Sequence, residues 1–293
     1  MRVLLTGANG QVGRCVQDVF AGSMHDLKPM DRSALDITDG AAVSRAVKAV
    51  RPDIIINAAA YTAVDKAESE PERARAINVT GSANLADAAS EIDALLVHIS
   101  TDYVFDGKAS IPYVEDHPTN PQCVYGRTKL QGEAEIQSRC NKHIILRTAW
   151  VFSEYGNNFL KTMLRLGQER DELGIVDDQR GCPTYARDIA RAVFSICEQY
   201  SYGREELGIY HFCGNEEVSW YQFADLIFQC AFRVGSIKKV PATKPILTQD
   251  YPTPALRPAY SGMSIMRFKS SYGVVPNSLP KNIEDCLAGL GHA

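Results

Sequence analysis

Tyr125 and Lys129 are the two side chains whose types and spacing most clearly suggest chemistry. They lie four residues apart in a stretch of helical length and period, so both project from one face of a helix. A phenol with a pKa of about 10 releases its proton more readily beside an ammonium, because the ammonium stabilises the phenolate. Such a pair can protonate the oxygen of a ketone that a hydride is reducing. The spacing alone equally fits an amphipathic helix that happens to carry both residues.

Thr101 is a third candidate because it follows the apolar run Leu95–Ser100. Short apolar runs bounded by turn-forming residues are typical of buried strands. At the carboxyl end of such a strand a hydroxyl would face a nicotinamide ring and hydrogen-bond the substrate oxygen. The sequence therefore predicts that Thr101, Tyr125 and Lys129 act together in the reduction of a ketone.

A glycine-rich turn opens the chain. Gly7, Gly10 and Gly13 have the spacing G-x-x-G-x-x-G, with Gln11 and Val12 between the last two. Glycine permits a tight turn and a close approach of the backbone to a pyrophosphate, and the following helix offers free N–H groups. The alternative is a tight strand-to-helix turn without a ligand. Because the motif follows a strand pattern and precedes a helix pattern, we predict a dinucleotide site.

Asp31 and Arg32 point to different forms of that dinucleotide. An acid at the end of the second strand accepts hydrogen bonds from the adenosine ribose and favours NADH. Arg32 and Ser33 follow at once, and a guanidinium with a hydroxyl can hold the 2′-phosphate of NADPH. A solvated loop acid is the third interpretation of Asp31. We therefore expect NADPH or NADH as the cofactor.

The pattern of the first half indicates the elements that would position these residues. Apolar runs rich in β-branched residues predict strands at Arg2–Thr6, Ile54–Asn57, Leu95–Ser100 and Ile144–Arg147, and the second strand should end near Leu27–Met30. Longer amphipathic stretches predict helices at Gln11–Phe20, Ala41–Val50, Pro71–Glu91 and Tyr125–Ser138. Alternation of this kind is typical of an α/β fold with a doubly wound parallel sheet, the Rossmann arrangement.

The pattern changes after residue 150. Helices are expected at Phe159–Arg170, Tyr185–Tyr200 and Trp220–Phe232, with fewer strands between them. Five prolines in residues 241–262 predict a long loop without regular structure. We expect residues 1–150, with about 180–205, to form the dinucleotide-binding domain. Residues 151–293 would mainly form a smaller, discontinuous α/β substrate domain.

Composition narrows the classes of function. The chain has 293 residues and a net charge of −4, without a basic tract, so we expect no nucleic-acid partner. No apolar run approaches the roughly 20 residues that span a bilayer, so we expect no membrane partner and a cytoplasmic protein. The eight cysteines contain no C-x-x-C pair, which favours reduced thiols and no metal site.

Five blocks of sequence carry a resemblance to a known family. They are Asn57–Glu70, Ser100–Gly107, Leu146–Phe152, Gly156–Phe159 and Tyr251–Pro258. With them the chain resembles the extended short-chain dehydrogenase/reductases, whose members mostly act on nucleotide sugars, and among these the dTDP-4-dehydrorhamnose reductases. The resemblance runs nearly end to end. It implies reduction of the C4 keto group of dTDP-4-dehydro-L-rhamnose to dTDP-L-rhamnose, with NADPH or NADH.

The resemblance also implies a role for individual residues. The implied cofactor contacts are Gly10, Gln11 and Val12 for the pyrophosphate, Asp31 for the adenosine ribose, Asp36 and Ile37 for the adenine, and Ala60, Tyr61 and Thr62 for the nicotinamide half. The implied substrate contacts are Thr101, Asp102, Trp150, Asn158 and Arg257. A core aromatic remains the alternative for Trp150, and a solvated charge for Arg257.

The chain departs from the family in places. Some relatives dimerise through a metal held by glutamates, but Gly13–Val16 and Tyr185–Arg187 supply no such acid, so we expect a monomer or weak homodimer without metal. Ser261-Gly-Met-Ser also departs from the family pattern. The remaining alternatives are a related nucleotide-sugar 4-reductase or epimerase and a non-catalytic NADP-binding regulatory subunit. A 4,6-dehydratase would carry a glutamate where this chain has Tyr103.

Overall fold

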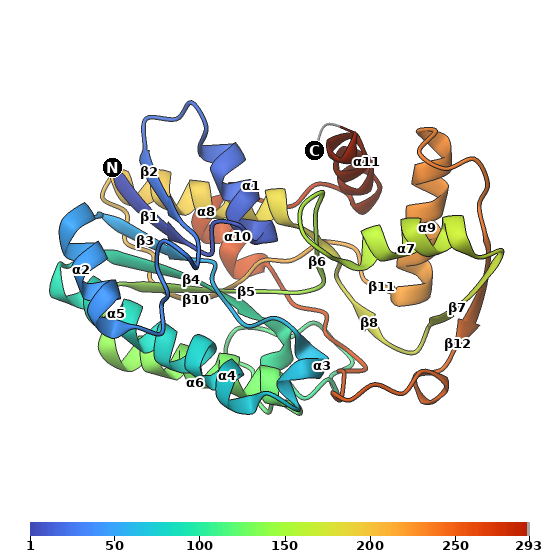
Figure 1. The fold of residues 1–293 in the computed structure, drawn as a ribbon, viewed down its shortest axis with the longest axis horizontal. Helices are drawn as coiled ribbons and strands as arrows, with labels where there is room; N and C mark the ends of the chain where they lie inside the picture. The colour runs from blue at the N-terminus through green and yellow to red at the C-terminus, as the bar shows by residue number, and fades with distance from the viewer. Residues whose placement is uncertain (292–293) are drawn as a thin grey trace.

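The computed structural model describes residues 1–291 and has a six-stranded parallel sheet at its centre (Figure 1). The order of its strands is β10-β5-β4-β3-β1-β2. Their bounds are Arg2–Thr6 for β1, Asp26–Met30 for β2, Ile54–Asn57 for β3, Leu95–Thr101 for β4, His143–Thr148 for β5 and Gly208–His211 for β10. In the sheet, β2 lies on one side of β1 and β3 lies on the other, so the strand order reverses at β1. This confirms the doubly wound α/β fold.

Helices cover both faces of the sheet (Figure 1). The helices on one face are α1 (Gln11–Phe20), α8 (Ala186–Ser201) and α10 (Met266–Tyr272). Those on the other are α2 (Gly40–Val50), α5 (Gly81–Glu91) and α6 (Val124–Arg139). In β3, Ile54 and Ile56 pack toward the first face and Ile55 toward the second. Both faces are therefore buried, which explains why the strands read as continuous apolar runs.

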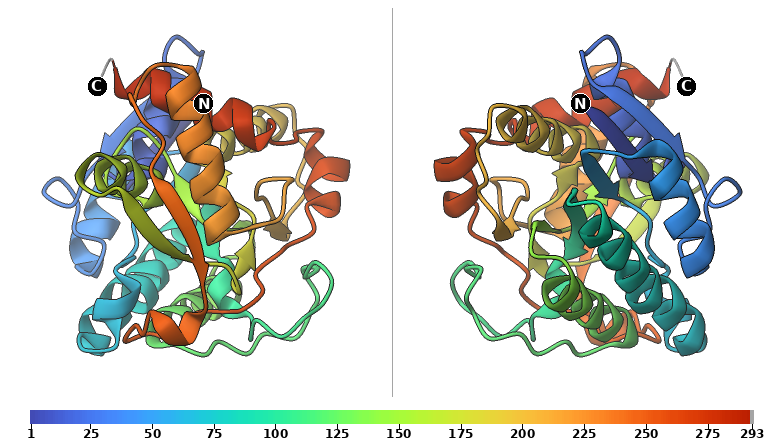
Figure 2. Two further views of the ribbon diagram at one scale, coloured as in Figure 1. Left: turned by 90° about the vertical axis from the view of Figure 1, so that its right-hand side faces the viewer. Right: turned by 90° about the vertical axis from the view of Figure 1, so that its left-hand side faces the viewer.

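A second hydrophobic core lies beside the sheet. It is built by α7 (Phe159–Glu169), α9 (Trp220–Arg233), α11 (Leu279–Leu290) and strand β7 (Glu172–Val176), which pairs with the outer strand β12 (Ala242–Ile246). Figure 2 shows β12 beside α9 on the outer side of this part. Two further pairs of two-residue strands are β6 (Val151–Phe152) with β9 (Thr184–Tyr185), and β8 (Arg180–Gly181) with β11 (Val218–Ser219).

The two cores support a division of the chain into two parts, which we propose as its domains. The larger would contain the sheet with α8, and the smaller the core around α9. The sheet also includes β10, which lies outside the ranges 1–150 and 180–205 expected for the dinucleotide-binding domain. Strand β10 pairs with β5 in parallel and closes that edge of the sheet.

The expectation of an irregular loop over residues 241–262 is wrong for part of its length. Strand β12 includes Pro245, and a 3-10 turn (η3) follows at Thr248–Asp250. Proline lacks an N–H group, but a strand with one neighbour needs hydrogen bonds on one side only. Within residues 1–291, strand β12 pairs with β7 alone, and β2, which contains Pro29, lies at an edge of the large sheet.

The single helix expected over Pro71–Glu91 is also wrong in detail. The structure has α4 (Pro71–Arg75), a five-residue π-helical turn η1 (Ala76–Thr80) and then α5. Amphipathic period does not distinguish a π turn from an α-helix over so short a length. Turns of this kind often occur at functional sites.

All eight cysteines are buried and have free thiols. Within residues 1–291, no helix is both long enough and apolar enough to cross a bilayer. The same residues contain no group of three or more His, Cys, Asp or Glu side chains arranged to hold a metal ion.

Candidate active site

The glycine turn joins β1 to α1 in a conformation that side chains would obstruct. Gly7 has a φ of +71°, and a Cβ there would lie 2.5 Å from the backbone nitrogen of Ala59. A Cβ on Gly13 would lie 2.2 Å from the carbonyl oxygen of Gly7. Gly10 precedes α1 and offers no side-chain cap. The first N–H groups of α1 are therefore available to an anion at the positive end of the helix dipole.

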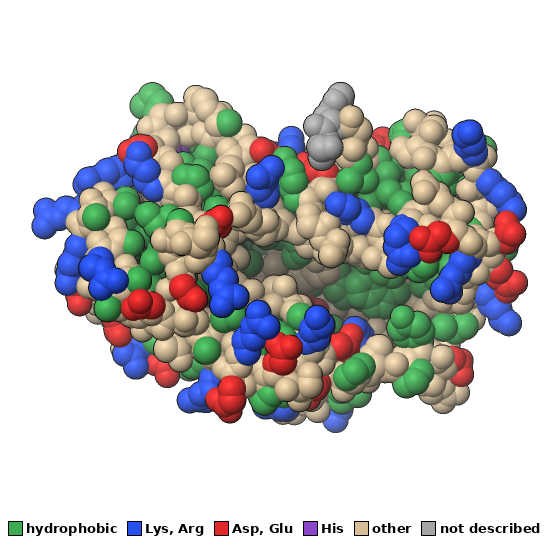
Figure 3. All heavy atoms as spheres, viewed as in Figure 1, with side chains coloured by type: hydrophobic (Ala, Val, Ile, Leu, Met, Phe, Trp, Pro, Cys, Tyr) green, Lys and Arg blue, Asp and Glu red, His purple; other side chains and the backbone are tan. Residues whose placement is uncertain are grey.

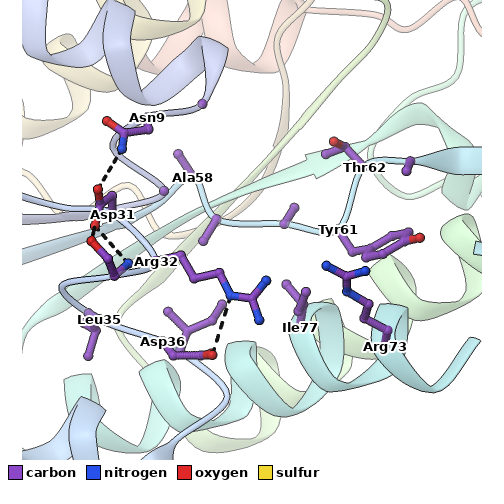
Figure 4. Close-up of a pocket in the computed structure, with 17 residues that line it drawn as sticks. Asn9, Asp31, Arg32, Leu35, Asp36, Ala58, Tyr61, Thr62, Arg73 and Ile77 are labelled. Atoms are coloured by element: carbon purple, nitrogen blue, oxygen red, sulfur yellow. Dashed lines mark hydrogen bonds and ion pairs between the residues drawn. The ribbon is translucent and has the colours of Figure 1, made fainter. Parts of the chain in front are cut away.

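A cavity of about 460 Å³ opens beside this turn (Figure 4). Its volume suits a small ligand or one part of a larger ligand. The predicted site residues that line it are Gly7, Gly10, Asp31, Arg32, Asp36, Ile37, Ala60, Tyr61 and Thr62. Ser33, proposed with Arg32 for the 2′-phosphate, also lines it, and the lining residues that sequence reasoning missed include Asn9, Leu35, Arg73 and Ile77. The cavity therefore brings the glycine turn, the end of β2 and the loop after β3 together.

Asp31 is held firmly at one end of the cavity. Its Oδ1 accepts from the backbone N–H and the hydroxyl of Ser33, at 2.9 and 2.6 Å, and its Oδ2 accepts from Asn9 at 2.7 Å. These hydrogen bonds lower the pKa of Asp31, and the bond from the hydroxyl of Ser33 has the largest effect. Arg32 lies beside Asp31, and its Nε is 3.7 Å from Asp36 (Figure 4). A carboxylate and a guanidinium thus border the same space.

The π turn holds the loop that carries Tyr61. The Oδ1 of Asn78 accepts from the backbone N–H of Tyr61 at 2.8 Å. Its Nδ2 donates to the carbonyl of Tyr61 at 3.2 Å and to Thr128 Oγ1, on α6, at 3.1 Å. Asn78 therefore ties the cavity wall to the helix of the predicted catalytic pair. Nothing local in the sequence marks Asn78, because its partners lie 17 and 50 positions away.

Tyr125 lies in the first turn of α6, next to the carboxyl end of β4. A Cβ on the neighbouring Gly126 would lie 2.2 Å from the carbonyl oxygen of Tyr103, so α6 contacts the short turn η2 (Asp102–Val104) backbone to backbone. The rings of Tyr103 and Tyr125 meet edge to face at 5.4 Å. Burial raises the pKa of the Tyr125 phenol, and a hydrogen bond with Thr101 lowers it in part. The phenol therefore keeps its proton at neutral pH, as a proton donor must.

Lys129 is buried one turn further along α6, with 1% of its surface exposed. Its Nζ donates to the carbonyl of Ile99 at 2.7 Å and lies 3.0 Å from His98 Nε2. Burial lowers the pKa of Lys129 to about 8, and the carboxylate of Glu133 opposes this shift. Glu133 is itself paired with Arg147 of β5, whose Nη2 lies 2.7 Å from Glu133 Oε2.

Thr101 and Asp102 lie at the carboxyl end of β4 beside Tyr125. The hydroxyl of Thr101 donates to Asp102 Oδ1 at 2.9 Å. Burial raises the pKa of Asp102 to about 6, while Thr101 and the hydroxyl of Ser261 act in the opposite direction. Ser261, which belongs to the part of the sequence that departs from the family pattern, therefore reaches the site from the far end of the chain.

The remaining predicted residues are placed away from the cavity wall. Among residues 1–291, the lining does not include Gln11, Val12, Gly13, Trp150, Asn158 or Arg257. Trp150 stacks face to face on Trp220, with the ring centroids 3.5 Å apart. Asn158 caps α7, and its Nδ2 donates to Gln11 Oε1 at 2.9 Å. These contacts join the glycine turn to the second core.

The space-filling view shows a hollow on this face of the molecule, between the sheet with its helices and the part that carries α7 and α9 (Figure 3). Arg257 belongs to the proline-rich segment 251–258, and its two terminal nitrogens lie 3.0 and 2.8 Å from the carboxylate of Asp65. In the same segment, Ala255 packs with Tyr61 and Tyr125 in one buried cluster. The segment therefore touches both the cavity wall and the predicted proton donor.

The chain is similar to known proteins along nearly its whole length. Residues 1–291 match the family model described as RmlD substrate binding domain. The dTDP-4-dehydrorhamnose reductase of Aggregatibacter actinomycetemcomitans is 44% identical over 289 residues, covering 98% of each chain.

Two solved structures are also similar along nearly the whole chain. A dTDP-4-dehydrorhamnose reductase from Clostridium acetobutylicum has a TM-score of 0.92 and 39% identity, covering 99% of this chain and 100% of that one. The enzyme of the same name from Bacillus anthracis, solved in complex with NADP, has a TM-score of 0.89 and 37% identity, with 98% and 99% covered. The chain therefore belongs to the dTDP-4-dehydrorhamnose reductase family of NAD(P)H-dependent oxidoreductases.

Proposed function

We propose that this enzyme reduces the C4 keto group of dTDP-4-dehydro-L-rhamnose to the hydroxyl of dTDP-L-rhamnose, with Tyr125 as the proton donor. The observation that carries the proposal is the meeting of Thr101, Tyr125 and Lys129 at the carboxyl end of β4. Thr101 lies close enough to Tyr125 to lower the pKa of its phenol, and Lys129 follows one helical turn after Tyr125. The relatives' names supply the substrate.

The residues around the glycine turn fit a nicotinamide dinucleotide. The N-terminus of α1, with Gly10, Gln11 and Val12, would hold the pyrophosphate, since its N–H groups have no side-chain cap. Asp31 or Arg32 would contact the adenosine ribose, and Asp36 and Ile37 the adenine. At the other end of the cavity, Ala60, Tyr61 and Thr62 would line the nicotinamide half. The relative from Bacillus anthracis that was solved with NADP supports this assignment.

When bound, the reduced nicotinamide supplies the hydride that C4 requires. The protein supplies the proton: the Tyr125 phenol gives it to the C4 oxygen as the carbonyl becomes a hydroxyl. Thr101 would turn its hydroxyl away from Asp102 to donate a hydrogen bond to the same oxygen and fix its position. As an ammonium, Lys129 favours the phenolate that remains, because opposite charges in a buried site attract strongly. The same side chain would also hold the ribose of the nicotinamide.

The substrate would enter from the side of residues 251–258. Arg257 suits the diphosphate, since its planar guanidinium matches phosphate oxygens, although two of its nitrogens already bind Asp65. Asp102 would contact the sugar from beside Thr101. Trp150 and Asn158 would act at the border with the second core, where their present contacts are with Trp220 and Gln11.

Single-turnover kinetics test the proposal. Purified enzyme is mixed with dTDP-4-dehydro-L-rhamnose and either NADPH or NADH, and the loss of absorbance of the reduced nicotinamide is followed. The product is identified by NMR, including the configuration at C4. Stoichiometric oxidation of the cofactor with formation of dTDP-L-rhamnose is the expected result. Cofactor binding without oxidation would show a binding protein, and a C4 epimer would show a related reductase.

A further inference from the structure

A line of buried polar side chains leads to Lys129 from β1 through β3 and β4. Thr6 Oγ1 donates to Asn57 Oδ1 at 2.8 Å, Asn57 Nδ2 lies 2.9 Å from His98 Nδ1, and His98 Nε2 lies 3.0 Å from Lys129 Nζ. Thr6, Asn57 and His98 stand opposite one another in the register of three neighbouring strands. None of the four residues has more than 1% of its surface exposed. The proposed reaction uses only Lys129.

The backbone fixes the direction of these hydrogen bonds. The N–H group of Ala59 points at Asn57 Oδ1 from 3.1 Å, and a backbone N–H can only donate. The atom of Asn57 that faces it is therefore the oxygen, and the NH₂ group faces His98. His98 Nδ1 must then accept, which leaves the ring proton on Nε2. Burial lowers the pKa of His98 well below its usual range, so the ring is neutral.

The fixed tautomer constrains Lys129. His98 presents an N–H group to Lys129 Nζ, and only an uncharged amine has the lone pair to accept it. The amine still has an N–H for the carbonyl of Ile99, at 2.7 Å. An ammonium would place two donors against each other. A reversed Asn57 amide would put its NH₂ group against the N–H group of Ala59. The charged Lys129 and the reversed Asn57 would each leave a buried polar group unsatisfied, at a cost of about 1–3 kcal/mol.

The charges around Lys129 come from several elements. His98 faces it from β4, Glu133 acts on it from α6, and Tyr125 precedes it by one turn of the same helix. The carboxylate of Glu133 favours the ammonium, but Arg147 of β5 holds that carboxylate with a bidentate ion pair. Asp102 of η2 acts on Tyr125, whose pKa it raises. Burial and the His98 hydrogen bond both oppose the charge on Lys129.

We propose that His98 is a positioning residue: held in one tautomer by Asn57, it donates a hydrogen bond to Lys129 and so favours the uncharged amine over the ammonium. The assignment of Lys129 to the reaction rests on the proposed function, but its protonation can be measured without any substrate. The ammonium would be present below the Lys129 pKa and lost as the pH rises through it. Affinity for NADPH and proton donation by Tyr125 should then fall together above that pH.

The test is an NMR titration of the cofactor-free enzyme labelled with ¹³C at lysine Cε. The Lys129 signal is assigned by its loss in Lys129→Met. In the wild type we expect a midpoint near the value of about 8. In His98→Gln the amide can rotate and offer its oxygen to an ammonium, so the midpoint should rise by at least about one pH unit, a tenfold change in proton affinity. The fall in NADPH affinity with pH should move by the same amount.

His143→Gln is the matched control, because His143 lies on β5 and bonds the carbonyl of Cys140, outside the site. It should leave the Lys129 midpoint unchanged. A wild-type midpoint at the ordinary lysine value of about 10.4 would overturn the proposal. So would a folded His98→Gln enzyme with the wild-type midpoint. Inactivity toward the nucleotide sugar would instead count against the proposed function and leave this titration intact.

A second measurement needs no variant. In wild-type enzyme labelled with ¹⁵N-histidine, the ring nitrogens of His98 should show the tautomer with the proton on Nε2. They should not titrate from about pH 6 to about pH 10, since the ring is buried and neutral. A proton on Nδ1, or an imidazolium signal, would contradict the proposed hydrogen-bond direction even if His98→Gln did not fold.

Discussion

Arg257 holds Asp65 with two nitrogens across 192 positions of the chain, at 3.0 and 2.8 Å. Asp65 also accepts a hydrogen bond from the backbone N–H of Ala255 at 3.2 Å. Asp65 belongs to the short helix α3 (Val64–Ala67), which follows the loop of Tyr61 and Thr62. This contact fastens the proline-rich segment 251–258 to the wall of the proposed nicotinamide site.

The first prediction separates two roles of Arg257. If Arg257 binds the substrate diphosphate, Arg257→Ala should raise KM for the nucleotide sugar by about 10-fold to 100-fold, the usual worth of charge-assisted hydrogen bonds. Asp65→Asn should then have a smaller effect. If Arg257 only fastens the segment, the two variants and their double mutant should be alike. Steady-state kinetics at saturating NADPH make the comparison, with the NADPH Kd as the control.

The Arg257–Asp65 pair also predicts a dependence on pH. Its hydrogen bonds lower the pKa of Asp65 below the ordinary 3.8, so the contribution of the pair to stability is present above that pH. The contribution is lost as the pH falls through the lower folded-state pKa. Both side chains are partly exposed, so the effect is small. Unfolding titrations of wild type and Asp65→Asn should differ at neutral pH and converge in acid.

Tyr125→Phe keeps the ring and removes the proton. It should lower kcat by about 10²-fold to 10⁴-fold, the usual worth of general acid catalysis. The Kd for NADPH should stay within about twofold, because the phenyl ring still packs on Tyr103. Single-turnover hydride transfer measures the first and fluorescence titration the second. Turnover near the wild-type rate would rule Tyr125 out as the proton donor.

Lys129→Met should both slow hydride transfer and weaken NADPH binding, since one ammonium serves the phenolate and the cofactor. Because Tyr125 and Lys129 act as a unit, the double variant should be little slower than the slower single variant. Independent, multiplying losses would show that the two residues do not cooperate. The same single-turnover experiment, performed on all four proteins, decides between these results.

Asp31 and Arg32 predict that NADPH and NADH both support turnover. Asp31→Ala should shift the preference toward NADPH, because it removes a negative charge from the proposed site of the 2′-phosphate. Arg32→Ala should shift it toward NADH. The measured quantity is the ratio of kcat/KM for NADPH to kcat/KM for NADH. Any damage to the turn around Asp31 that weakens both cofactors equally cancels in this ratio. Equal ratios in all three proteins would place the ribose elsewhere.

Gly126→Ala should reduce kcat although it adds only a methyl group. The new Cβ would meet the carbonyl oxygen of Tyr103 at 2.2 Å, so the first turn of α6 must move and carry Tyr125 with it. Gly291→Ala is the control, because its Cβ would meet its nearest neighbour at an ordinary 3.5 Å. We compare kcat and thermal stability in the two variants. A loss of kcat without a matching loss of stability would show that the position of Tyr125 has changed. Equal kcat in the two variants would contradict the close packing.

The sequence by itself determined the elements whose signals are local. Glycine spacing predicted the turn between β1 and α1, because only glycine tolerates the φ of Gly7 and the contact at Gly13. Apolar runs predicted β1, β3, β4 and β5, since both faces of a parallel sheet are buried, whereas the edge strand β2 contains no such run. The family resemblance supplied the proposed site, and the comparisons confirm the family.

The tertiary structure decided what depends on partners far apart in the chain. Strand β12 forms despite Pro245 because β7 pairs with only one of its edges. Asn78 reaches Tyr61 and Thr128 from a π turn that the helical period conceals. The ring proton of His98 is fixed by Asn57, 41 positions earlier, because strand register places the two side by side. The direction of a hydrogen bond between such residues depends on which backbone donor the fold brings next to them. No local pattern in the sequence predicts this direction.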